Sequence, residues 1–160
     1  MFLQYHPGRD YCYTTPMKLK HVDHIGINVV DLQKVKDFFV GLGFTVVGEM
    51  TMEGELVDKV TGLKGAKDDM VMLQAPDGQL NLELVNFHNP VDEAGLQPSA
   101  ANTLGMRHLC FQVEGFDEIV ADLQQKGYQL MGEVQNYEDT FKLCYVQGPE
   151  GIIIELAEQL

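Results

Sequence analysis

The chain contains an internal repeat, and this repeat limits its possible folds more than any other feature. Residues 22–49 align without a gap on residues 106–133 at a constant offset of 84, which places His24 on His108. A gap-free match of this length predicts two structural modules of one type, because equal hydrophobic patterns form equal elements. The chain is therefore expected to fold as a duplicated unit.

The segments that close the two halves also resemble each other. PDGQLNLEL in the first half corresponds to PEGIIIEL in the second, with a difference of one residue between the turn and the acidic residue. This correspondence places Glu83 on Glu155. Each half therefore begins near a histidine and ends near a glutamate.

Within each half, the hydrophobic pattern predicts a strand, a helix and then three strands. Asp31 is suited to the N-cap of the first helix and Gly43 to its left-handed end. The second helix is expected around Phe116 to Leu123, with Gly127 as its stop. The strands after the helices are expected at 45–50, 70–75, 80–87, 129–134, 141–147 and 152–157, with Pro-Asp-Gly and Pro-Glu-Gly turns before the last strands.

These elements predict an α+β fold of two tandem βαβββ modules, whose curved sheets enclose a site. A single domain is expected over residues 17–160, after an extension at 1–16 that has no counterpart in the repeat. Module one spans about 18–87, a linker rich in Pro, Gly, Asn and Ala spans 88–105, and module two spans 106–160.

Strand parity indicates that the repeated histidines and glutamates share one kind of surface. Successive side chains of a strand point to opposite faces. In all four strands concerned, the ligand-type residue has the parity opposite to the run of aliphatic residues, although Ile153 shares the parity of Glu155. If the aliphatic faces pack on the helices, the opposite faces carry His24, Glu83, His108 and Glu155.

A metal site is the hypothesis that explains the four positions together. A single histidine or glutamate on a polar strand face is usually a solvated residue, but here both repeats carry ligand-capable side chains at equivalent positions. Two imidazoles and two carboxylates form a mixed N/O set suited to Ni, Co, Zn, Mn or Fe(II). Four protein ligands leave about two positions of an octahedron for substrate oxygens.

At these residues the chain resembles the vicinal-oxygen-chelate superfamily, which includes glyoxalase I, methylmalonyl-CoA epimerase, extradiol dioxygenases, fosfomycin-resistance thiol transferases and bleomycin-binding proteins. The resemblance covers Lys18 to Leu160 and rests on the motifs DHIGINV, LELVNF, RHLCFQV and PEGIIIEL. It implies that the first and fourth strands of each module carry the ligands of one divalent metal, here His24, Glu83, His108 and Glu155.

The ligand pattern resembles that of glyoxalase I, because a glutamate stands at the Glu83 position as well as at Glu155. The resemblance implies a metal-dependent lyase or isomerase, in which Glu83 or Glu155 is the catalytic carboxylate that transfers a proton on a small carbonyl substrate. Two alternatives remain open: an Fe(II) ring-cleaving dioxygenase or thiol transferase, and a metal-free small-molecule binding or resistance protein.

Composition narrows the partners and the location. The net charge of −13 disfavours nucleic acid and anionic membranes, and no stretch has the roughly 20 apolar residues of a membrane span. Without a secretory signal pattern, a cytoplasmic protein is expected, and its three cysteines predict no disulfide framework. Since the chain has only two arginines, Arg9 and Arg107, we expect a small, neutral substrate. We also expect a homodimer.

Overall fold

The computed structural model describes residues 19–97 and 99–160, so the predicted extension at 1–16 lies outside the described residues. The first module contains β1 (His24–Asn28), α1 (Leu32–Gly41), β2 (Thr45–Glu53), α2 (Glu55–Thr61), β3 (Lys67–Gln74) and β4 (Asn81–Asn89). The second module contains β5 (His108–Gln112), α3 (Phe116–Gln125), β6 (Gln129–Leu130), β7 (Gln135–Tyr137), β8 (Phe141–Gln147), the short 3-10 helix η1 (Pro149–Gly151) and β9 (Ile153–Gln159).

Each module forms its own mixed sheet, as the repeat predicted. The first sheet has the order β1-β4-β3-β2 and the second the order β5-β9-β8-β6, with β7 paired to β8. In both sheets the first and last strands of the module lie side by side and run parallel, while the other pairs are antiparallel. This pairing brings a residue at the start of a module next to one at its end.

Helix α1 begins and ends where the sequence indicated. The Asp31 side chain accepts a hydrogen bond of 3.0 Å from the backbone N–H of Lys34, which satisfies one of the free donors at the helix start. After the helix, Gly43 takes a φ of 99°, a left-handed conformation that glycine adopts without steric cost. The predicted helix boundaries are therefore confirmed by the caps that define them.

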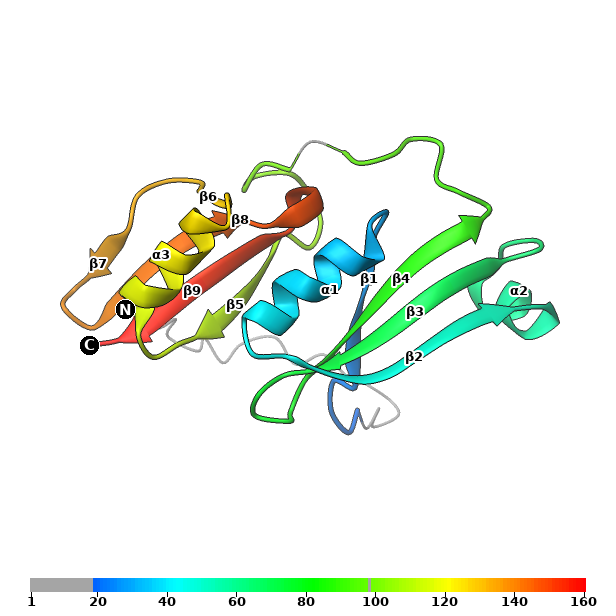
Figure 1. Ribbon diagram of the computed structural model, residues 1–160, viewed down its shortest axis with the longest axis horizontal. Coiled ribbons are helices and arrows are strands. Elements are labelled where there is room, and N and C mark those ends of the chain that lie inside the picture. The colour runs from blue at the N-terminus through cyan, green and yellow to red at the C-terminus, as the bar shows by residue number, and fades with distance from the viewer. Residues whose placement is uncertain (1–18, 98) are drawn as a thin grey trace, which may run out of the picture.

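One hydrophobic core runs through both modules. Phe38 of α1 meets Tyr128 of the second module with ring centroids 4.8 Å apart, and Phe44 meets Phe111 at 5.7 Å. The helix-facing aliphatic residues of the last strands are fully buried in this core: Leu82, Leu84, Ile154 and Leu156. In Figure 1, α1 lies in the middle of the molecule, with the first sheet on one side and η1 with the second sheet on the other.

A carboxylate of the second module also anchors the start of α1. Glu150, in η1, accepts hydrogen bonds from the backbone N–H groups of Val30 (2.8 Å) and Asp31 (2.5 Å). Glu150 itself has a φ of 54°, a left-handed conformation that is uncommon outside glycine. The two modules are thus joined by a polar contact at the same end of α1 that the Asp31 cap stabilises.

Several elements of both modules differ from the sequence prediction. The segment 55–61, expected as loop, forms α2 with an ion pair between Lys59 and Glu55 (2.6 Å) and ends at Gly62 in the left-handed conformation. Strands β2 and β4 are longer than expected, so β4 extends into the predicted linker.

The strand predicted at 129–134 is correct only at its beginning. Strand β8 pairs with β6 and, nearer its start, with β7. Between these pairings, residues 131–134 lie opposite only residues 144–145, so this segment holds two extra residues and keeps one hydrogen bond to β8, from the Met131 N–H to the Tyr145 carbonyl. Gly132 lies in this segment, where a residue without a side chain adds little to strand stability.

None of the helices in the described part of the chain is long and apolar enough to cross a membrane.

Candidate metal centre

The first half of the candidate site is formed by β1 and β4. Their parallel register sets His24 opposite Asn81 and Gly26 opposite Glu83, so that His24 and Glu83 lie diagonally on one face. His24 Nε2 lies 3.6 Å from Glu83 Oε2, and the two side chains are 40% and 27% exposed. A Cβ placed on Gly26 would lie 3.6 Å from that same Glu83 oxygen, so a small residue here keeps the carboxylate uncrowded.

The second half repeats this geometry on β5 and β9. His108 lies opposite Ile153 and Cys110 opposite Glu155, and His108 Nε2 is 3.1 Å from Glu155 Oε2. The side chains of His108 and Glu155 are 35% and 20% exposed. Strand parity therefore predicted the correct face in both modules, and the two histidine–glutamate pairs are equivalent.

Two neighbours were not singled out from the sequence. Asp23 Oδ2 is 2.9 Å from His24 Nδ1, the ring nitrogen that does not face Glu83. Tyr145 lies opposite Glu155 in the β8–β9 pairing, and its ring centroid is 4.9 Å from that of His108. The DH dipeptide in the sequence was a usable signal for Asp23, whereas the contact of Tyr145 depends on strand register.

Neighbouring charges and burial shift the pKa values of several groups around the two pairs. The hydrogen bond that the Asp23 carboxylate accepts from the His24 ring raises the pKa of His24, with a smaller contribution from the Glu83 carboxylate, and the same bond lowers the pKa of Asp23. Burial, followed by the charge of Glu155, raises the pKa of Tyr145 and brings that of Cys110 to about 11. Cys110 is therefore a neutral thiol at neutral pH.

The structure brings the four predicted residues together as two pairs and not as one cluster. In residues 19–97 and 99–160 of a single chain, no group of three or more His, Cys, Asp or Glu side chains is placed to hold a metal ion. The shared core is built from the helix-facing sides of both modules, so both histidine–glutamate faces lie outside it. One chain alone does not assemble the predicted four-ligand site.

Each pair nevertheless fits the geometry of two ligands on one ion. Ligand atoms about 2.0–2.2 Å from the same metal lie roughly 3–4 Å apart across adjacent coordination positions. The observed N–O separations of 3.6 Å and 3.1 Å fall in this interval. An imidazole with a carboxylate is also a donor combination that divalent transition metals accept.

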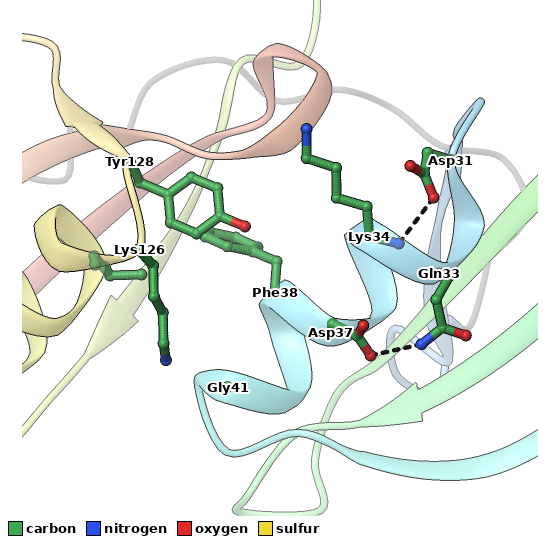
Figure 2. A pocket seen from close by; sticks show the side chains of 9 residues that line it. Asp31, Gln33, Lys34, Asp37, Phe38, Gly41, Lys126 and Tyr128 are labelled. Carbon is green, nitrogen blue, oxygen red and sulfur yellow. Dashed lines mark hydrogen bonds between the residues drawn. The ribbon is translucent and has the colours of Figure 1, made fainter.

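The groove between α1 and the end of α3 is a different surface. Figure 2 shows the residues of α1 that line it, from Asp31 to Gly41, on one side and the side chains of Lys126 and Tyr128 on the other. The volume of this groove is about 460 Å³. Within it, Gln33 Nε2 donates to Asp37 at 2.7 Å. None of the four ligand-type residues lines this groove.

The fold and the paired sites define a class of protein: a duplicated βαβββ protein with a histidine and a glutamate at equivalent positions of each module. A family model matches residues 23–145 of the chain. The chain belongs to the Glyoxalase/Bleomycin resistance protein/Dioxygenase superfamily.

The relatives are similar over nearly their whole length. The chain is 31% identical to the uncharacterized protein YaeR of Escherichia coli over 143 residues, which are 88% of this chain and 98% of YaeR. It is 31% identical to the uncharacterized protein YwkD of Bacillus subtilis over 89% of this chain and all of YwkD. A crystal structure of a glyoxalase family protein from Bacillus cereus is 38% identical, with a TM-score of 0.83, and covers 90% of this chain and 97% of that one.

Proposed function

We propose that the protein is a divalent-metal-dependent lyase or isomerase of glyoxalase type, whose metal site is completed by a second copy of the chain. One copy supplies His24 and Glu83, and the other supplies His108 and Glu155. The observation that carries this proposal is the presence of two equivalent histidine–glutamate pairs, each with ligand spacing, that do not meet within one chain.

The exposure of both pairs supports completion by a partner. All four side chains are between 20% and 40% exposed, although each carboxylate lies against its histidine on an ordered strand. A homodimer with twofold symmetry would place the first pair of each copy against the second pair of the other. It would form two identical sites, each with two imidazoles and two carboxylates.

The chemistry follows from that ligand set. When bound, a divalent cation would supply electrophilic stabilisation of negative charge on a substrate carbonyl oxygen. His24 and His108 would hold the cation, and two carboxylates would offset its charge. Glu83 or Glu155 would take a proton from the carbon next to the carbonyl and return it to the neighbouring atom, because a carboxylate can act as both base and acid.

Mixing two inactive variants tests the partner-completed site. His24→Ala and His108→Ala chains should each lose metal alone, because a site with one imidazole removed retains only three ligands. A dimer with one chain of each kind contains one intact site and one doubly damaged site. Unfolding and refolding an equal mixture should therefore restore about a quarter of the wild-type metal content, since about half of the dimers are mixed.

His88→Ala serves as the control for the loss of a histidine. His88 is also exposed, at 42%, and pairs with Asp69 at 2.8 Å, away from both candidate pairs. This variant should keep full metal content. If the refolded mixture of the first two variants binds no metal, the partner-completed site is wrong.

The two carboxylates are separated by conservative substitutions. Glu83→Gln and Glu155→Gln each retain an oxygen that can coordinate, but the amide cannot accept a proton at neutral pH. One of them should keep its metal and lose deuterium exchange at the carbon next to the carbonyl of hydroxyacetone, followed by NMR in D₂O. If both variants exchange at the wild-type rate, neither glutamate is the base.

Elemental analysis of untagged protein purified without chelator distinguishes the other classes. Ni, Co, Zn or Mn with proton exchange supports the proposed lyase or isomerase. Iron with cleavage of a catechol ring would replace it by a dioxygenase, and a metal-free protein that binds small molecules would replace it by a sequestering protein.

A further inference from the structure

A cavity lies where the edge strands of the two modules face each other. Its volume is about 550 Å³, within the range of small-molecule sites. Residues of β1 line one side of the cavity, and residues of β5 and of the turn from η1 into β9 line the other. Residues of the linker complete the lining. Its apolar surface comes from both modules and the linker: Ile25, Ile27, Leu104, Met106, Leu109 and Ile152.

Arg107 is the permanently cationic side chain of this cavity, which His108 also lines. Its Nε donates 2.8 Å to the carbonyl oxygen of Met106, and in residues 19–97 and 99–160 no carboxylate forms an ion pair with the guanidinium. Arg107 shares the parity of the helix-facing residues Leu109 and Phe111. Because β5 is an edge strand of its sheet, Arg107 lines the cavity between the two modules.

Several other polar groups of the cavity already have partners. Ser99 Oγ donates to the Gly151 carbonyl, and Gln97 Nε2 donates to the carbonyls of Ala94 and Gly95. The carboxylate of Glu150 is held by two backbone N–H groups of the first module. Among the described residues, the terminal N–H groups of Arg107 have no ion-pair partner and remain charged donors of the cavity.

The charge balance selects the class of ligand. A single guanidinium matches one carboxylate through two parallel hydrogen bonds. A phosphate dianion would need more positive charge than Arg107 supplies and would be repelled by Glu150, which also lines the cavity. The aliphatic wall favours an apolar body attached to the anionic group.

We propose that this cavity between the modules binds a small monocarboxylate with an aliphatic tail, whose carboxylate pairs with Arg107. The inference goes beyond the proposed function and does not require a metal. Because the ligand would contact β1 on one side and β5 and Ile152 on the other, its binding would stabilise the observed arrangement of the modules.

Titration with hexanoate tests the proposal on the full-length protein in the presence of chelator. Hexanamide is the matched neutral probe, because it has the same length and shape without the charge. Hexanoate should raise the melting temperature and shift the amide NMR signals of Gly26, Arg107 and Gly151. Hexanamide should bind about tenfold or more weakly, since a charge-assisted bidentate contact is lost.

Variants locate the binding. Arg107→Gln should reduce hexanoate affinity about tenfold or more and leave hexanamide affinity unchanged. Lys64→Gln removes the same charge from an exposed loop and should bind hexanoate as the wild type does. Equal affinity for the two probes, wild-type affinity in Arg107→Gln, signal shifts outside the cavity, or no binding in the millimolar range would each overturn the proposal.

His108 lines this cavity and also belongs to the candidate metal site, whereas His24 does not line it. Because chelator is present, hexanoate binding is measured without metal. Loss of metal binding in His24→Ala would leave the carboxylate site untouched, and failure of hexanoate binding would leave the proposed lyase or isomerase untouched.

Discussion

Removal of the Glu150 carboxylate should weaken the connection between the two modules. Glu150 accepts two backbone hydrogen bonds at the start of α1, at 2.8 Å and 2.5 Å, and its side chain is half-buried. Glu150→Ala leaves both N–H groups without this partner, although water can reach part of the site. We therefore expect a loss of about 1–2 kcal/mol, near the lower end for hydrogen bonds to charged groups. For a chain of this size the melting temperature should fall by roughly 2–8 °C.

Glu150→Gln provides the finer comparison. The amide keeps one acceptor oxygen, so its loss should be about half that of the alanine variant. Both replacements retain a Cβ at the left-handed φ of 54°, so the backbone strain is common to all three proteins. Glu133→Gln, at an exposed position, controls for the change in net charge. In differential scanning calorimetry, Glu150→Ala should have the lowest melting temperature, Glu150→Gln an intermediate one and Glu133→Gln the highest. If Glu150→Ala were as stable as Glu133→Gln, the reasoning would be refuted.

Three further measurements test other parts of the fold. Phe39→Ala should cost about 3–5 kcal/mol by thermal unfolding, because Phe39 is fully buried between Phe38 and Phe44; a loss under about 1 kcal/mol would contradict that packing. Cys144, whose pKa burial raises to about 11, should react with a thiol reagent at pH 8 only after denaturation. Backbone hydrogen bonds lower the pKa of Asp58, so its contribution to stability is present above the unfolded pKa of 3.8 and is lost as the pH falls through the folded pKa. The free energy of unfolding of Asp58→Asn should therefore decrease less than that of the wild type as the pH is lowered into this range.

The parts of the fold that could be predicted from the sequence depend on local rules. The alternation of β1 and β4 placed His24 and Glu83 on one face, because strand parity holds whatever covers the sheet. The Asp31 cap and the Gly43 stop were equally predictable, since each acts within one turn of α1. The repeat then transferred these results to the second module.

The separation of the two pairs could not be predicted in this way. Each module has an aliphatic face that must be covered, but the pattern does not specify which surface covers it. In the structure the helix-facing sides share one core through contacts such as Phe44 with Phe111, so the ligand faces remain outside. The same modules could satisfy the same pattern with the ligand faces together. For the same reason, the position of Arg107 in the seam between modules was not evident from its parity.

The parallel pairing of the first and last strand of each module has a consequence for folding. His24 pairs with Asn81, 57 residues away, and His108 pairs with Ile153, 45 residues away. Contacts between distant segments form slowly, because the intervening chain must first lose its conformational freedom. The two proposed ligands of each module are likewise far apart in the sequence, His24 from Glu83 and His108 from Glu155, so these pairs cannot nucleate structure locally as the closely spaced ligands of a zinc finger do. If the proposed site binds a metal, its uptake during refolding should follow the closure of both sheets, and the uptake rate would report the last step of assembly.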